Sequence, residues 1–156
     1  MPQFLRIAAQ VLQRPLKDFS MQTDSTATNA QSVLVVDDDP FSQDLMREIL
    51  NSLGVAHIYC ANNGIEGMRS LSRLNCRPDL LICDVFMPDM DGFEFLNKLG
   101  QLNYSGGVIL VSGGNPEMLQ IAKDVAIADG INLKGAYPKP VSSNVLKQAI
   151  TQACLH

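Results

Sequence analysis

From Val33 onward, short apolar runs alternate with segments in which apolar residues recur every three or four positions. The runs have the length of strands buried on both faces of a sheet, and the intervening periodicity is typical of amphipathic helices. Such alternation predicts parallel strands joined by crossover helices, that is, an α/β, doubly wound (βα)5 sheet with helices on both faces. The five predicted strands are VLVV (33–36), VAHIYCA (55–61), DLLICDVF (79–86), GVILVSGG (107–114) and LKGAYPKP (133–140).

The first predicted helix begins at Pro40, directly after Asp39. Proline favours the first helical position, and aspartate is a preferred N-cap. The further helices are predicted at about 63–75, 93–102 and 116–129, and from Ser142 or Ser143 to about Cys154. Apolar residues recur at every fourth position of this segment, at Phe41, Leu45, Ile49 and Leu53, which predicts a helix that ends near Gly54.

Residues 1–31 have a different pattern. A short amphipathic helix is predicted before Pro15, with Arg6 and Gln13 away from its apolar side. The segment MQTDSTATNAQS (21–32) is polar and cannot bury enough apolar surface to offset the entropy of ordering, so it is interpreted as a linker. The expected organisation is therefore an N-terminal extension (1–31) and one folded domain (32–156). The apolar side of the predicted N-terminal helix consists of Phe4, Ala8, Val11 and Leu12.

Composition narrows the functional classes. The chain has 156 residues, 46% of them apolar, and 12 basic against 16 acidic residues give a net charge of −4. This is the length and composition of one globular domain, and no basic excess favours direct nucleic-acid binding. Since neither a signal peptide nor a run of eighteen apolar residues is present, we expect a cytoplasmic protein without membrane insertion.

The four cysteines do not suggest a metal site. None forms a CxxC pair, and the chain has only two histidines, so zinc binding is not expected. Reduced thiols are the simplest interpretation, with Cys83 as a buried apolar residue.

Polar side chains follow four of the predicted strands. The first strand ends in Asp37, Asp38 and Asp39, the third in Asp84, the fourth in Ser112 and the fifth in Lys139. Carboxyl ends of parallel strands meet at one edge of a sheet, where ligands bind. We therefore expect carboxylates, a hydroxyl and an ammonium group to converge there, with Asp39 instead capping the following helix.

Such a cluster has a definite chemistry. Neighbouring carboxylates raise one another's pKa, so they stay ionised only if a cation joins them. Oxygen ligands without His or Cys suit a hard ion such as Mg²⁺. The ammonium of Lys139 and the hydroxyl of Ser112 are groups that stabilise an incoming phosphoryl group. The site therefore favours phosphoryl transfer onto a carboxylate.

The segments VLVVDDDP, LLICDVFMPDMDG, VILVSGG and YPKPV, in this order, resemble the receiver domain of two-component response regulators. The resemblance covers about Ser32 to Cys154. It implies a flavodoxin-like sheet with strand order 2-1-3-4-5, the order for which chemotaxis receivers are a standard example. It also implies a signalling module that is not an enzyme, apart from catalysing its own phosphorylation and dephosphorylation.

By resemblance, Asp84 matches the phosphoacceptor, which attacks a phosphohistidine of a sensor histidine kinase or phosphotransfer protein. Ser112 matches the switch hydroxyl, and Lys139 matches the lysine that pairs with the phosphoryl group and precedes a cis peptide at Pro140. The signal would pass to a downstream protein partner through a changed surface, with a homodimer as a further possible outcome.

The family's metal site can be carried over in the same way. The resemblance implies that Asp38 binds Mg²⁺ directly and Asp37 through water. Asp84 and the backbone carbonyl of Phe86 complete the expected set. Phe86 is bulkier and less polar than residues often found at this position of receivers. We therefore predict that it restricts hydrolytic water and slows dephosphorylation.

The chain departs from the family pattern in two places. Receivers usually carry Phe or Tyr three residues before the lysine, where this chain has Ala136. The aromatic Tyr137 comes one residue later, and one step along a strand points a side chain to the opposite face. The interval from Ser112 to Lys139 is 139 − 112 = 27 positions, which predicts an extended fourth helix or exit loop. In this it is similar to receivers of EAL-type phosphodiesterase regulators.

Two alternatives remain open from the sequence. Ala136 is compatible with a degenerate receiver that acts as a phosphate-independent scaffold. A phosphohydrolase with an aspartyl-phosphate intermediate, of the haloacid-dehalogenase type, would use an Asp after the first strand and a second acid two residues later. Asp37 and Asp39 have that spacing, although Asp84 would then have no role.

Overall fold

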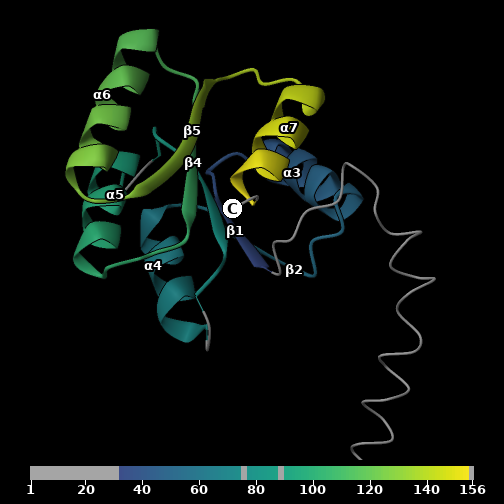
Figure 1. The fold of residues 1–156 in the computed structure, drawn as a ribbon, viewed down its shortest axis with the longest axis horizontal. Helices are drawn as coiled ribbons and strands as arrows, with labels where there is room; N and C mark the ends of the chain where they lie inside the picture. Colours follow the sequence, from purple (N-terminus) through teal and green to yellow (C-terminus); the bar gives the residue numbers. More distant parts are fainter. Residues whose placement is uncertain (1–31, 75–76, 88–89, 155–156) are drawn as a thin grey trace, which may run out of the picture.

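The computed structural model describes residues 32–74, 77–87 and 90–154, and its strands form one parallel sheet (Figure 1). The sheet order is β2-β1-β3-β4-β5, so the predicted fold class and strand order are confirmed. The predicted N-terminal helix and linker lie outside the described residues. The strands are β1 (Ser32–Val36), β2 (His57–Ala61), β3 (Leu80–Asp84), β4 (Gly107–Ser112) and β5 (Asn132–Pro138). The helices are α3 (Pro40–Ser52), α4 (Gly64–Arg73), α5 (Gly92–Gln101), α6 (Pro116–Ala128) and α7 (Ser143–Ala153).

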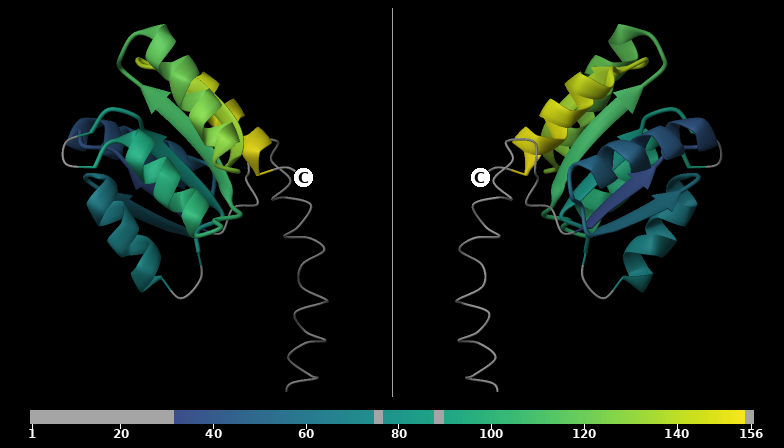
Figure 2. Two further views of the ribbon diagram at one scale, coloured as in Figure 1. Left: turned by 90° about the vertical axis from the view of Figure 1, so that its left-hand side faces the viewer. Right: turned by 90° about the vertical axis from the view of Figure 1, so that its right-hand side faces the viewer.

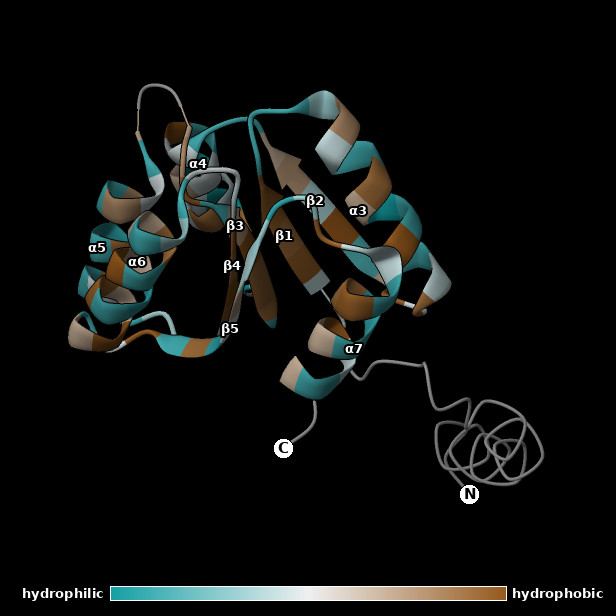
Figure 3. Ribbon diagram, turned by 90° about the horizontal axis from the view of Figure 1, so that it is seen from above, coloured by the Kyte–Doolittle hydropathy of each residue, from teal (hydrophilic) through white to brown (hydrophobic). Residues whose placement is uncertain are grey.

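The helices form two layers on either side of the sheet (Figure 2). α3 and α7 contact each other on one face, whereas α4, α5 and α6 follow one another on the other. Each face has its own apolar core, and the strands β1, β3 and β4 contribute alternate residues to both, which explains their continuous apolar runs (Figure 3). Within the described ranges, no helix is long and apolar enough to cross a membrane.

Each helix begins at a side chain that accepts a hydrogen bond from a backbone N–H of its first turn. This arrangement satisfies donors that have no partner inside the helix. The predicted cap of α3 is confirmed, and Ser142 rather than Ser143 caps α7. The five caps are Asp39, Asn63, Asp91, Asn115 and Ser142.

The helix predicted from Pro40 is confirmed as α3, but only some of its apolar positions are buried. Phe41 is 78% exposed and Leu45 is 36% exposed, whereas Ile49 and Leu53 are buried. The helix meets the sheet through a face shifted from the every-fourth-residue line, because Met46 and Leu50 are also buried. The beginning of α3 therefore presents two large apolar side chains outside the core.

Candidate functional site

Four of the polar residues predicted to meet do lie together at the carboxyl edge of the sheet. Asp37 follows β1, Asp84 ends β3, Ser112 ends β4 and Lys139 follows β5. The parallel register places Asp84 opposite Val111. The backbone N–H of Lys139 donates to the carbonyl of Ser112 at 2.7 Å, which ties the ends of the last two strands together. The fold therefore brings together residues up to 102 positions apart.

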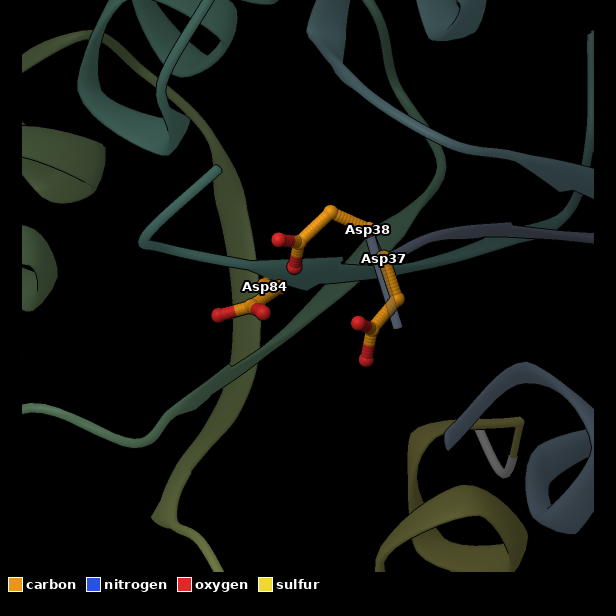
Figure 4. A group of neighbouring side chains, drawn as sticks. All are labelled: Asp37, Asp38 and Asp84. Carbon is orange, nitrogen blue, oxygen red and sulfur yellow. The ribbon is translucent and has the colours of Figure 1, made fainter. Parts of the chain in front are cut away.

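Three carboxylates form the centre of this site (Figure 4). Asp37, Asp38 and Asp84 each place a carboxylate oxygen within 4.8 Å of the others. The side chains of Asp37 and Asp84 are buried, whereas Asp38 is exposed. The cluster therefore combines two carboxylates fixed by the sheet with a third that faces solvent at its rim.

Lys139 bridges the two buried carboxylates. Its Nζ lies 2.9 Å from Oδ2 of Asp37 and 3.1 Å from Oδ2 of Asp84. Burial lowers the pKa of Lys139, but the hydrogen bond to Asp37 and the charges of both carboxylates outweigh it, so the net pKa is raised. The ammonium group therefore stays charged beside the carboxylates.

The pKa of Asp84 is raised above its ordinary value. Burial is the main cause, and the nearby charge of Asp37 adds to it, whereas Lys139 and the backbone N–H of Phe86 oppose it. That N–H lies 3.2 Å from Oδ1. The neighbouring thiol of Cys83 also has a raised pKa, because it is fully buried and faces both carboxylates. Cys83 is thus the inert buried residue that was predicted.

Gln43, on α3, positions the first carboxylate and was missed by the sequence analysis. Its side-chain Nε2 donates to the backbone carbonyl of Asp37 at 2.6 Å and to Oδ1 of Asn62 at 2.8 Å. The side chain is buried on the same helix face as Met46 and Leu50. An amide at the start of an apolar stripe was the available signal, because a buried amide needs hydrogen-bond partners.

Ser112, the last residue of β4, and Phe86, in the loop after β3, also lie at the carboxyl edge of the sheet. The hydroxyl of Ser112 is buried and accepts a hydrogen bond from the N–H of Gly114 at 3.2 Å. The Phe86 ring lies directly over Gly114, so closely that a Cβ on this glycine would overlap ring atoms. The peptide between Lys139 and Pro140 is cis, as the resemblance implied. The loop after β3, the loop after β4 and Lys139 thus lie around the carboxylate of Asp84.

The chemistry of this donor set fits a divalent cation. Three carboxylates and one ammonium leave a formal charge of −3 + 1 = −2 within the cluster. All three candidate ligand side chains offer oxygen, which suits Mg²⁺ and not a thiol- or imidazole-seeking ion. The triad is of the kind typical of receiver magnesium sites.

Asp39 does not join the cluster. Its carboxylate accepts hydrogen bonds from the N–H of Phe41 at 3.1 Å and from the hydroxyl of Ser42 at 3.0 Å. The first of these bonds is the main reason why the pKa of Asp39 is lowered. The N-cap interpretation of Asp39 is confirmed, and its carboxylate is committed to the start of α3.

The two unusual positions on β5 lie on opposite faces of the sheet. Ala136 packs against the core under α4, α5 and α6, whereas Tyr137 packs against the core under α3 and α7. Tyr137 therefore does not occupy the place that Ala136 leaves without an aromatic ring. The long interval before Lys139 contains the 13-residue α6 and the seven-residue β5, whose pairing with β4 shifts register between Val108 and Ile109.

Comparison with known proteins supports one family. The model of the response regulator receiver domain matches residues 33–151. Sensor histidine kinase RcsC of Escherichia coli K12 is 33% identical over 119 residues, which are 76% of this chain and 12% of that protein. The probable C4-dicarboxylate response regulator DctR of Priestia megaterium is 31% identical over 127 residues, 79% of this chain and 51% of that protein.

Solved structures have the same fold. A response regulator from Colwellia psychrerythraea superposes with a TM-score of 0.67 at 27% identity, covering 78% of this chain and 94% of that one. Chemotaxis protein CheY4 of Vibrio cholerae gives 0.66 at 25% identity, covering 80% and 98%. Together with the acidic cluster and its lysine, these matches show that the chain belongs to the response regulator receiver domain family.

Proposed function

We propose that this protein accepts a phosphoryl group on Asp84 from a phosphohistidine of a histidine kinase or phosphotransfer protein. The observation that carries the proposal is the ammonium of Lys139, 3.1 Å from Oδ2 of Asp84 within a cluster of three carboxylates. Burial of carboxylates beside one another is unfavourable, so this cluster is not expected to stabilise the fold. This supports a role in binding a phosphoryl ligand. The folded unit would comprise residues 32–156, with residues 1–31 as an extension.

The proposed step is a displacement at phosphorus. A carboxylate oxygen of Asp84 forms a P–O bond as the P–N bond of the phosphohistidine breaks, and the electron pair leaves on the imidazole, which takes a proton from solvent. Lys139 neutralises charge on the phosphoryl oxygens, and the hydroxyl of Ser112 donates to one of them. Bound by Asp37, Asp38, Asp84 and the carbonyl of Phe86, Mg²⁺ would supply the charge that lets an anionic donor approach.

The output would be a change of surface recognised by a protein partner, including a second copy of the chain. The Ser112 hydroxyl accepts a hydrogen bond from the N–H of Gly114, so a rotation of this side chain toward the phosphoryl group would weaken that bond and let the loop after β4 shift. Ala136 removes the ring that usually follows this movement in receivers. The predicted similarity of the Ser112–Lys139 segment to receivers of EAL-type regulators concerns the ancestry of the chain or its partner surface, and it remains a prediction.

A labelling experiment tests the proposal. The protein is incubated with acetyl phosphate and Mg²⁺, and its intact mass is measured. One phosphoryl increment is expected, lost with a chelator and in Asp84→Asn. Asp39→Asn is the matched control, because it removes a neighbouring carboxylate but keeps a side chain that can cap α3, and it should be labelled normally. Failure of the wild type under conditions that label another receiver would contradict the proposal.

The scaffold alternative is favoured by one observation, the small side chain of Ala136 on the face where the switch ring is expected. It predicts no label and unchanged partner binding in Asp84→Asn. The phosphohydrolase alternative is weakened because the second acid it needs, Asp39, caps α3. Turnover of p-nitrophenyl phosphate, lost in Asp37→Asn, would favour it.

A further inference from the structure

An apolar groove lies between α3 and α7, beside the acidic cluster. Its volume is about 430 Å³, within the range of about 300–1,000 Å³ typical of ligand sites. Its walls include the two apolar residues of α3 that the core leaves exposed, Phe41 and Leu45. A phenylalanine exposed to 78% at the mouth of a groove is a surface that another apolar segment can cover. Met46, Val141 and Leu146 form the floor and the far wall.

Acidic side chains lie around the α3 side of this groove. Asp44 and Glu48 are exposed on α3, whereas Asp37, which lines the groove, is paired with Lys139 at 2.9 Å. Glu48 is three residues after Leu45 and therefore lies on the same side of the helix. An occupant of this groove should thus be apolar on one side and carry basic residues at its edges.

The N-terminal extension has this composition. Its predicted helix has an apolar side that includes Phe4 and Val11, and it contains Arg6, followed by Arg14 and Lys17. Residues 1–31 carry three basic and two acidic residues, 3 − 2 = +1, whereas residues 32–156 carry nine and fourteen, 9 − 14 = −5. The charges of the extension and the folded domain are therefore complementary.

The extension is also long enough. It joins the domain at Ser32, the first residue of β1, while the groove lies near the other end of this five-residue strand, about 16 Å away along its axis. Residues 20–31 can span about 40 Å when extended. The predicted helix can therefore reach the groove within one molecule.

We propose that residues 4–12 dock as an amphipathic helix into the groove between α3 and α7, covering Phe41 and Leu45. The tether gives an effective concentration in the millimolar range, so an interaction too weak to persist between separate molecules is populated within one chain. Lys139 lines the same groove. The proposed docking site therefore lies beside the acceptor pocket. This proposal does not depend on phosphorylation of Asp84.

Peptide-resolved hydrogen exchange on the full chain tests this docking. Val11→Asp places a charge on the apolar side of the predicted helix, and Gln13→Asp adds the same charge on the opposite side. We expect Val11→Asp to speed exchange in the first half of α3 and in residues 141–146 by about two- to tenfold, and Gln13→Asp to match the wild type. Leu45→Ser, at an exposed position of the groove, should have the same effect as Val11→Asp.

Three outcomes would overturn the proposal. Equal exchange in the wild type and Val11→Asp would show that the extension does not cover the groove. Protection of α3 that grows with protein concentration would assign the groove to a second copy of the chain. An effect of Val11→Asp confined to the opposite cavity, which Arg77 and Lys134 line, would place the extension at the amino edge of the sheet.

Discussion

Polar groups lie at both edges of the sheet, but their roles differ. At the amino edge, the N–H of Ser32 donates to Oδ2 of Asp79 at 3.0 Å, and the N–H of Asp79 lies 3.3 Å from the Ser32 hydroxyl. The hydroxyl of Tyr104 donates to the carbonyl of Pro78 at 2.8 Å. These bonds hold the connection before β3 against its neighbours.

At the carboxyl edge, like charges are gathered instead. Asp37, Asp38 and Asp84 lie within 4.8 Å of one another, and one ammonium group serves two of them. The pKa of Asp84 is raised because burial raises it by more than the charge and hydrogen bond of Lys139 lower it. The hydrogen bonds at the first edge stabilise the fold, whereas the carboxylates at the second repel one another and are held together by the fold and by Lys139.

The largest expected difference between the edges concerns phosphorylation. Lys139→Met removes the positive charge beside Asp84 and should lower the rate of labelling by a small phosphodonor about 100-fold, the usual effect of losing one charge-stabilising donor. Tyr104→Phe should leave this rate unchanged and lower the free energy of unfolding by about 1–2 kcal/mol, because the Pro78 carbonyl loses its donor. Labelling rates and urea denaturation measure both. Equal labelling of Lys139→Met and wild type would refute the contrast.

A smaller effect is expected on stability at the carboxyl edge. Since the folded state raises the pKa of Asp84, the folded state binds a proton more tightly, and stability falls as pH rises from the ordinary value of 3.8 through the folded pKa. Without divalent ions, the free energy of unfolding of Asp84→Asn should therefore be about 1 kcal/mol higher than that of the wild type at neutral pH. This difference should disappear below pH 3.8.

Denaturant titrations of both proteins across this pH range, in the presence of a chelator, provide the measurement. Asp39→Asn is the control, because the pKa of Asp39 is lowered rather than raised and its pH dependence should have the opposite sign. Mg²⁺ should stabilise the wild type more than Asp84→Asn. A wild type more stable than Asp84→Asn at neutral pH in chelator would contradict the interpretation of this edge.

The fold and the meeting of Asp37, Asp84, Ser112 and Lys139 could be predicted from the sequence for one physical reason. Parallel strands end at a common edge, so residues that end apolar runs are neighbours whatever the details of packing. The resemblance to a family added the strand order, which alternation alone leaves open. The cap at Asp39 also followed from local chemistry, since a helix start needs an acceptor.

What could not be predicted depends on tertiary packing. Periodicity predicted the helix α3, but a window of sequence does not contain the sheet, so it could not show that α3 buries Met46 and Leu50 and leaves Phe41 exposed. Gln43 was missed because its partners, Asp37 and Asn62, are distant from it in the chain or belong to the backbone. The buried face of α3 and the partners of Gln43 both depend on the three-dimensional arrangement of the chain.

The smallest expected effect concerns the lifetime of the phosphorylated form. Phe86 has a side chain that is 39% exposed and lies over Gly114, beside the carboxylate that would carry the phosphoryl group. A ring at this place limits the approach of water, so Phe86→Asn should shorten the half-life of the phosphorylated protein about three- to tenfold. Leu102→Asn is a matched control, because Leu102 is 40% exposed but lies at the amino edge.

Decay of the phosphoryl increment in intact mass, after removal of the donor, measures this lifetime in all three proteins. A wild type that decays as fast as Phe86→Asn would remove Phe86 from the determinants of lifetime. Faster decay in Leu102→Asn as well would attribute the effect to loss of surface apolarity in general. A change confined to Phe86→Asn would show that the carboxyl edge controls not only whether a phosphoryl group is accepted but also how long it stays, while the amino edge affects neither.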